Sequence, residues 1–99
     1  MTKLKNFQAV GCNLSQDIIS DEFFKLESLE NLNLSRNAFT TIDKIIGLKK
    51  LKMLDISHNE LMELPEDIGE LEELKLLNAR SNNLTMLPSS LKNISKLNV

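Results

Sequence analysis

Asp55, Ser57 and His58 are the residue types of a hydrolytic catalytic triad, and they lie within four consecutive positions. In such a triad the histidine takes the proton of the serine, and the acid orients the histidine. An extended chain places Asp55 and Ser57 on one side. However, His58 follows the serine directly, and no nucleophile elbow or oxyanion loop is visible around it. We therefore expect no catalytic residue here and a protein that is not an enzyme.

The sequence has too few cysteine and histidine residues for a structural metal site or an internal disulfide. The chain has one cysteine, Cys12, and one histidine, His58, which together cannot make a structural zinc site. Its three scattered glycines form no glycine-rich phosphate loop. We expect no metal and no cofactor. A single cysteine cannot form an internal disulfide, so the sequence favours a reducing, cytoplasmic location.

Length and composition are those of one small globular domain. The chain has 99 residues, of which 41% are hydrophobic and 26% charged, and its formal net charge is −2. This balance favours neither nucleic acid nor an anionic membrane surface as a partner. No apolar run reaches the roughly 18 residues that a membrane-spanning helix needs. The residues after Met1 also do not lead into an apolar signal-peptide core.

A repeat explains the composition, which includes 19 leucines and 11 asparagines. The spacing Leu-x-x-Leu-x-Leu-x-x-Asn-x-Leu occurs in four copies, with Ala9 and Cys12 as exceptions in the first copy and Ala79 in the fourth. These copies begin at Leu4, Leu29, Leu51 and Leu74, and we expect a truncated fifth copy to begin at Leu97. Four copies in one phase indicate that each is one structural unit of a stacked array.

On this motif the chain resembles the leucine-rich repeat (LRR) family over nearly its whole length. The resemblance implies an α/β LRR solenoid in a single domain over residues 1–99, with a short curved parallel sheet on the concave side. Helical, 3₁₀ or extended segments would form the convex side. The repeats look like the 22- and 23-residue types of intracellular proteins. The asparagine slot implies a structural ladder of inward amides, with a small buried thiol in the first copy: Cys12, Asn37, Asn59 and Asn82.

The outward strand positions define the candidate binding face. Alternate residues of a strand share a side, so Asp55 points outward when Leu54 and Ile56 point into the core. Met and Arg are typical interface anchors, and amides supply adaptable hydrogen bonds. The candidate partner-binding residues of the concave face are Gln8, Asn33, Asp55, Asn78, Arg36, His58, Arg80, Met53 and Leu76.

Two other surfaces also carry expectations. Charges one repeat apart alternate in sign, which predicts the ion pairs Lys49–Glu72 and Glu30–Lys52. No polar cap is recognisable at either end, so we expect an open apolar C-terminal end. Three explanations compete: the chain is a fragment of a longer protein, which we favour; it packs end-on against a partner or itself, as self-association through the uncapped C-terminal repeat; or residues 85–99 are poorly ordered. The side chains expected at this end are Leu84, Leu87, Leu91, Ile94 and Leu97.

Together these features favour a non-catalytic protein–protein interaction module that binds a protein partner through its concave sheet face. The identity of that partner is not encoded in the sequence. The alternative is a regulatory or sensor LRR segment of a larger signalling protein, linked to a kinase or a GTPase, whose remainder is absent.

Overall fold

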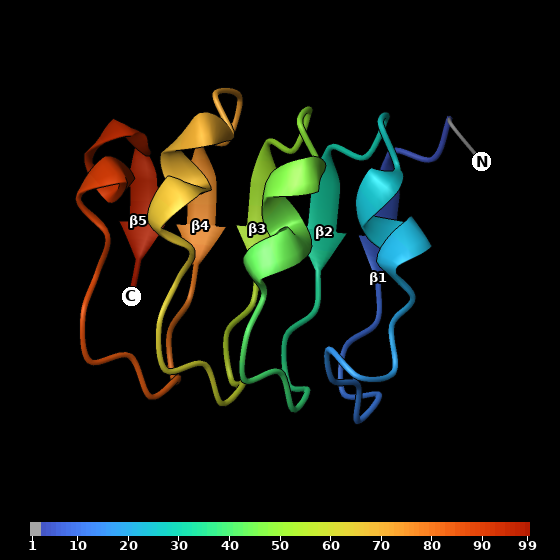
Figure 1. Cartoon of the computed structure of the whole chain (residues 1–99), viewed down its shortest axis with the longest axis horizontal. Helices are drawn as coiled ribbons and strands as arrows, with labels where there is room; N and C mark the ends of the chain where they lie inside the picture. The colour runs from blue at the N-terminus through green and yellow to red at the C-terminus, as the bar shows by residue number, and fades with distance from the viewer. Residues whose placement is uncertain (1–2) are drawn as a thin grey trace.

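A short strand followed by a short 3₁₀ helix is the repeating unit of the fold (Figure 1). The structure is a computed structural model and describes residues 3–99. Within that range the strands are β1 (Asn6–Gln8), β2 (Asn31–Asn33), β3 (Met53–Asp55), β4 (Leu76–Asn78) and β5 (Lys96–Asn98). The 3₁₀ helices are η1 (Asp21–Lys25), η2 (Asp43–Gly47), η3 (Glu66–Glu70) and η4 (Ser89–Asn93).

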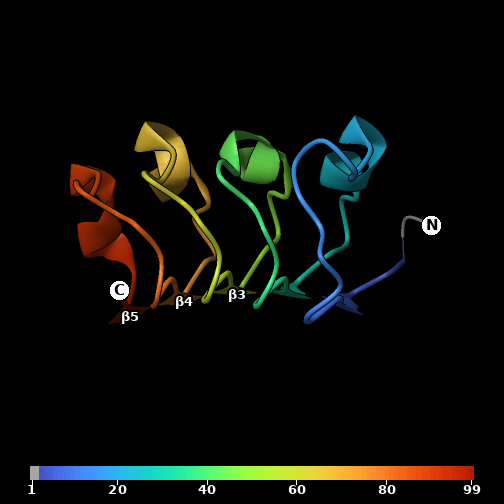
Figure 2. The ribbon, with the colours of Figure 1, turned by 90° about the horizontal axis from the view of Figure 1, so that it is seen from below.

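The strands form one parallel sheet in the order β1-β2-β3-β4-β5. Leu32 of β2 pairs with Phe7 on one side and with Leu54 on the other, so equivalent slots of successive repeats are in register. Figure 2 shows the strands along one side of the molecule and the 3₁₀ helices along the opposite side. This arrangement confirms the predicted solenoid, with 3₁₀ helices as its convex segments throughout the described chain.

Leucine-slot residues fill one continuous core between the sheet and the helices. In the second copy Leu29, Leu32 and Leu34 are completely buried. The same slots of the third and fourth copies, at most 1% exposed, hold Leu51, Leu54, Ile56, Leu74, Leu77 and Ala79. Each helix adds one buried residue from its inner side: Phe24, Ile45, Ile68 and Leu91. Because the core uses one side of the sheet, the other side is left for polar residues.

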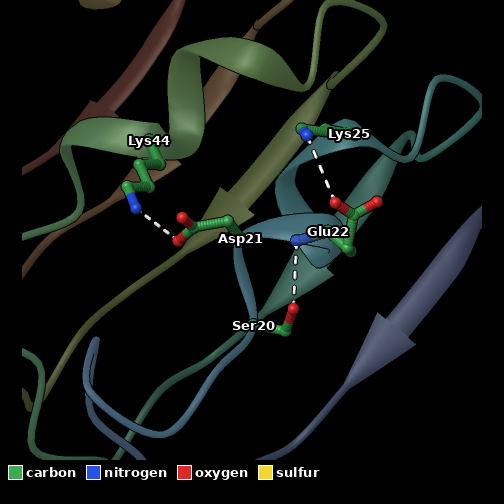
Figure 3. Close-up of polar contacts among 5 residues, drawn as sticks. All are labelled: Ser20, Asp21, Glu22, Lys25 and Lys44. Atoms are coloured by element: carbon green, nitrogen blue, oxygen red, sulfur yellow. Dashed lines mark hydrogen bonds and ion pairs between the residues drawn. The ribbon is translucent and has the colours of Figure 1, made fainter.

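Polar contacts on the convex side fix the first helix (Figure 3). Ser20 caps η1, since its Oγ accepts a hydrogen bond from the Glu22 N–H at 3.2 Å. Within the helix Lys25 pairs with Glu22 at 3.2 Å, and Lys44 of η2 pairs with Asp21. The hydrogen bond from Lys44, together with its positive charge, lowers the pKa of Asp21. This last pair links two successive repeats.

The two predicted inter-repeat ion pairs have different outcomes. The Glu30–Lys52 pair is confirmed, with 3.5 Å between Glu30 Oε1 and Lys52 Nζ. The Lys49–Glu72 pair is wrong, because Lys49 Nζ instead lies 3.9 Å from Oε1 of Glu70. The Glu72 N–H bonds to the Glu70 carbonyl, so both acids belong to one tight turn. The long lysine side chain meets the acid on the helix side of that turn.

The expected start of the fifth copy is also wrong. Leu97 pairs with Leu77, which occupies the second leucine slot, so Leu97 does not begin a repeat. Leu77 lies six positions after Leu71 at the end of η3, whereas Leu97 lies only three positions after Ile94 at the end of η4. Because of this shorter connection, all three residues of β5 pair with β4. The pairing gives hydrogen-bond partners to the backbone groups of β4 that face away from β3.

Candidate functional site

One face of the sheet is left uncovered by the helices (Figure 2). The middle residue of each strand points toward the core, so the first and third residues point to this concave face. First positions hold Asn6, Asn31, Met53, Leu76 and Lys96, and third positions hold Gln8, Asn33, Asp55, Asn78 and Asn98. Six of the nine candidate residues therefore lie together on the face, while Arg36, His58 and Arg80 follow the strands at its rim.

The first-position column changes character along the sheet. Nδ2 of Asn31 donates to Oδ1 of Asn6 at 2.5 Å, which joins the amides of β1 and β2. Met53 and Leu76 follow as half-buried apolar side chains, and Lys96 on β5 is exposed. A shallow depression at the N-terminal half is lined by Asn6, Phe7, Gln8, Asn31, Asn33 and Met53. The face thus offers an amide-rich part next to an apolar part.

Three of the central candidates also hold the turns that end their strands. The side-chain Oδ1 of each accepts a hydrogen bond from the backbone N–H two residues later, at 3.0 Å for Asn33 and Asp55 and 3.2 Å for Asn78. Asn and Asp side chains have the length for this Asx-type turn. Sequence reasoning missed this role, although an Asn or Asp in the same slot of three repeats is its signal.

Asp55, Ser57 and His58 do not assemble as a catalytic triad. The Ser57 hydroxyl donates directly to Asp55 Oδ1 at 2.7 Å, so the acid takes the place that a histidine would need. Ser57 is only 6% exposed, whereas His58 is exposed in the following turn. The three residues build a turn rather than a hydrolytic centre.

The turn after each strand has an unusual backbone conformation. The equivalent position of each of the four copies has φ between 55° and 67°, and it is occupied by Gly11, Arg36, His58 and Ser81. In the first copy Asn13 also has a positive φ, of 56°. This left-handed region suits glycine and costs other residues about 1–2 kcal/mol. The Arg36 N–H bonds to the Ser57 carbonyl at 3.0 Å, and the His58 N–H bonds to the Arg80 carbonyl at 2.9 Å. Arg36 and His58 occupy the left-handed position, whereas Arg80 directly precedes Ser81. The side chains of Arg36, His58 and Arg80 are exposed on neighbouring repeats, and we call these three residues the basic rim.

Asparagines behind the turns connect successive repeats. Asn59 is buried, and its Oδ1 accepts a hydrogen bond from the Phe39 N–H at 3.0 Å. Its Nδ2 donates to three backbone carbonyls at 3.0–3.1 Å, those of Leu34, Ile56 and Ser57. Asn37 and Asn82 bridge their preceding repeats in the same way. Each amide therefore satisfies backbone groups that the leucine core would otherwise leave without partners.

Cys12 differs from the other members of this slot. Its thiol is exposed, so the expected burial is wrong, and its Sγ lies 3.6 Å from the Val10 carbonyl oxygen. The reason is its place in the first copy, at the outer end of the described solenoid. The Cys12 N–H still joins the ladder, because it donates to Oδ1 of Asn37 at 3.0 Å.

Large apolar side chains are exposed at the outer end of the last copy. Between 41% and 75% of each is accessible, and they are Met86, Leu87, Leu97 and Val99. The expectation of exposure is thus correct for Leu87 and Leu97. It is wrong for Leu91, which is 4% exposed because it points from η4 into the core. Leu84 and Ile94 are partly buried against the core. End-on self-association through this surface stays a prediction.

Among residues 3–99, no group of three or more His, Cys, Asp or Glu side chains could hold a metal ion. No helix in the same range is long and apolar enough to cross a membrane.

A stack of strand–turn–3₁₀ units bridged by asparagine side chains defines a solenoid repeat protein. The family model described as leucine rich repeat matches residues 9–61, and the chain belongs to this family. Domains of this family generally serve as protein-interaction modules, and the family and fold are typically non-enzymatic.

The chain is similar to segments of much longer proteins. It is 38% identical over 66 residues to a transforming growth factor beta activator, LRRC33, of Danio rerio, covering 65% of this chain and 10% of that protein. It is 41% identical over 71 residues to a volume-regulated anion channel subunit, LRRC8E, of Xenopus tropicalis, and this match covers 69% of this chain and 9% of that protein. A solved LRR protein of Leptospira interrogans matches with a TM-score of 0.70 and 39% identity, over 77% of this chain and 20% of that one. The chain therefore spans about a tenth of the length of these curated relatives.

Proposed function

We propose that this chain is a non-catalytic module that binds a protein partner through the concave face of its sheet. The separation of the two sides of the sheet carries the proposal. The 3₁₀ helices lie on one side of the sheet (Figure 2), and the core lies between them and the sheet. The first and third residues of every strand point to the other side. A scaffold that keeps one whole face of its sheet uncovered is suited to holding another chain against that face.

The composition of the concave face supports a protein as the partner. Met53 and Leu76 supply an apolar centre, and the amides of Asn6, Asn31 and Gln8 supply hydrogen bonds beside it. Five strands about 4.8 Å apart span roughly 19 Å, which suits an extended segment of five or six residues. Because a standard interface takes about 800 Å² from each partner, this face alone would give a modest affinity.

The exposed free thiol of Cys12 is consistent with our proposal of a cytoplasmic location.

A matched pair of variants tests the concave face. Met53→Asn combined with Leu76→Asn removes the apolar centre, and the fold should tolerate it because Asn31 occupies the same column. Met62→Asn makes the same chemical change at a residue outside the strands that is 62% exposed. The immobilised chain would capture partners from a lysate of source cells, and each one identified by mass spectrometry would be purified.

Titration of a purified partner then gives the result. We expect the concave double variant to weaken binding at least about tenfold and the Met62 variant to leave it within about twofold, because a few residues near the centre of an interface carry most of its binding energy. Equal affinity of the native chain and the concave variant, with both shown to be folded by circular dichroism, would refute the proposed face. The absence of any partner that binds saturably would refute the module itself.

We propose as a second candidate that the chain is a regulatory or sensor segment of a larger signalling protein. The observation that favours it is that the chain spans about a tenth of its curated relatives. Immunoblotting of source cells with an antibody against the chain tests this. A band far above the 11.2 kDa of the chain is expected, and a band at that mass alone would refute the second candidate.

A further inference from the structure

The two arginines and the histidine of the chain lie apart from its lysines. Its only two arginines and its only histidine form the basic rim, whereas its ten lysines lie elsewhere. Among the described residues, the ion pairs are made by Lys25, Lys44, Lys49 and Lys52, and none of these pairs includes a rim residue. Seven of the 14 acidic residues lie between Glu60 and Glu73, in the segment that contains η3. The rim is therefore a cationic edge on a chain of net charge −2.

Backbone hydrogen bonds place the rim residues on neighbouring chain segments, with Arg80 one position earlier in its repeat than Arg36 and His58 are in theirs. Arg36 bonds to Ser57 next to His58, and His58 bonds to Arg80, so the three side chains come from three neighbouring chain segments. At about 4.8 Å between strands, Arg36 and Arg80 are roughly 10 Å apart at the backbone. In an extended peptide, alternate side chains share a side and lie roughly 6.7 Å apart. The long arginine side chains can converge over the remaining distance of roughly 3 Å, so two carboxylates at alternate positions can reach both arginines.

The residue types at the rim suit carboxylates. The planar guanidinium of arginine forms two parallel hydrogen bonds to one carboxylate and is less strongly hydrated than the ammonium group of lysine. Between the two arginines, His58 adds a ring N–H donor. Arg36 and His58 also occupy the left-handed position that Gly11 fills in the first copy, at a backbone cost that glycine would avoid.

We propose that the basic rim recognises an acidic segment of a partner protein, in which carboxylates occupy alternate positions of an extended chain. The proposal rests on the proposed function, because the rim borders the concave face and extends it. The proposal specifies that the partner segment is acidic, which the apolar residues Met53 and Leu76 do not determine.

Asp55 provides an internal test of this chemistry. It is the one acidic residue among the outward strand positions, and it lies one strand away from Asn33 and Asn78. Both asparagines make the same turn hydrogen bond as Asp55, so Asp55→Asn should keep the fold while removing a negative charge. An acidic ligand should then bind about two- to threefold more tightly, which is the effect of removing one screened repulsion at roughly 7 Å.

The experiment uses fluorescence anisotropy with labelled peptides of known composition. The probe is a twelve-residue peptide of alternating glutamate and glycine, and the matched peptide has glutamine in place of glutamate. A single-stranded oligothymidine of twelve nucleotides provides a nucleic-acid anion. The rim variant is Arg36→Gln with Arg80→Gln. Its control is Lys50→Gln with Lys92→Gln, which removes the same charge from two exposed residues outside the rim.

We expect the glutamate peptide to bind and the glutamine peptide not to bind. The rim variant should weaken binding by about tenfold or more, whereas the lysine control should change it by less than about twofold. Equal losses in both variants would overturn the proposal, because they would show only an effect of net charge. Binding of the oligothymidine at least as tight as that of the peptide would also overturn it in favour of a nucleic-acid partner. So would the absence of binding by the glutamate peptide.

The two proposals fail in distinguishable ways. If the purified partner depends on Met53 and Leu76 but the rim variant changes neither partner nor peptide binding, the rim proposal alone fails. If the rim variant abolishes peptide binding while the Met53 and Leu76 variant leaves the partner bound, the proposed role of Met53 and Leu76 in partner binding is refuted. The rim proposal is then retained.

Discussion

Replacing Asn59 with alanine removes the most buried amide of the ladder. The side chain satisfies one backbone N–H, that of Phe39, and three backbone carbonyls. Each of the carbonyls keeps another donor in the variant, so the Phe39 N–H is the group left without a partner. A buried unsatisfied donor costs about 1–3 kcal/mol. Together with the weaker loss at the carbonyls, Asn59→Ala should lower the free energy of unfolding by about 2–3 kcal/mol.

Urea denaturation followed by circular dichroism measures this change. The midpoint should fall while the slope of the free energy against urea stays constant, since the surface exposed on unfolding is almost the same. Asn83→Ala is the matched control, because Asn83 is exposed next to Asn82, and it should change stability by less than about 0.5 kcal/mol. A loss of less than about 0.5 kcal/mol for Asn59→Ala would refute the reasoning that the amide satisfies a buried backbone group.

Three further changes have expected outcomes. Gly11→Ala should destabilise the chain by about 1–2 kcal/mol in urea, because φ is 67° and the new Cβ meets no atom within 4 Å, which leaves backbone strain as the cause. Gly47→Ala should cost about 1–3 kcal/mol and lower the melting temperature, since its Cβ would lie 2.5 Å from the Phe24 carbonyl oxygen. Lys44 lowers the pKa of folded Asp21, so their pair stabilises above the unfolded value of about 4, and the gain is lost as the pH falls through the lower folded value. Asp21→Asn should therefore reduce stability at about pH 6 but not at about pH 2, and equal losses at both would contradict the pairing.

Regular spacing made most of the fold predictable from the sequence. Alternation along a strand assigns Leu54 to the core and Asp55 to the opposite face, and the repeat places both beside their counterparts in the next strand. The same comparison of equivalent positions found the Glu30–Lys52 pair. These predictions succeed because, in a stacked repeat, residues one repeat apart in the sequence lie side by side in the structure.

Local side-chain geometry and the last register were not predictable from spacing. The hydrogen bond from the Ser35 N–H to Oδ1 of Asn33 depends on the backbone conformation of the turn. The repeat pattern gives the residue type at each position but not this conformation. Leu97 could occupy either of two leucine slots, and backbone pairing with β4 selected the second. The basic rim was only partly found, because its arginines and histidine were identified as candidates without the left-handed turn that Arg36 and His58 share.

Methyl resonances of methionine provide the most direct test of partner binding at the concave face. Met53 lies on that face, Met62 is exposed in a loop, and Met86 lines the apolar C-terminal end. A purified partner would be added to the chain labelled with ¹³C at the methionine methyl groups. We expect the Met53 signal to shift or broaden while the Met62 and Met86 signals stay in place. A response at Met86 or Met62 with an unchanged Met53 signal would contradict binding through the concave sheet.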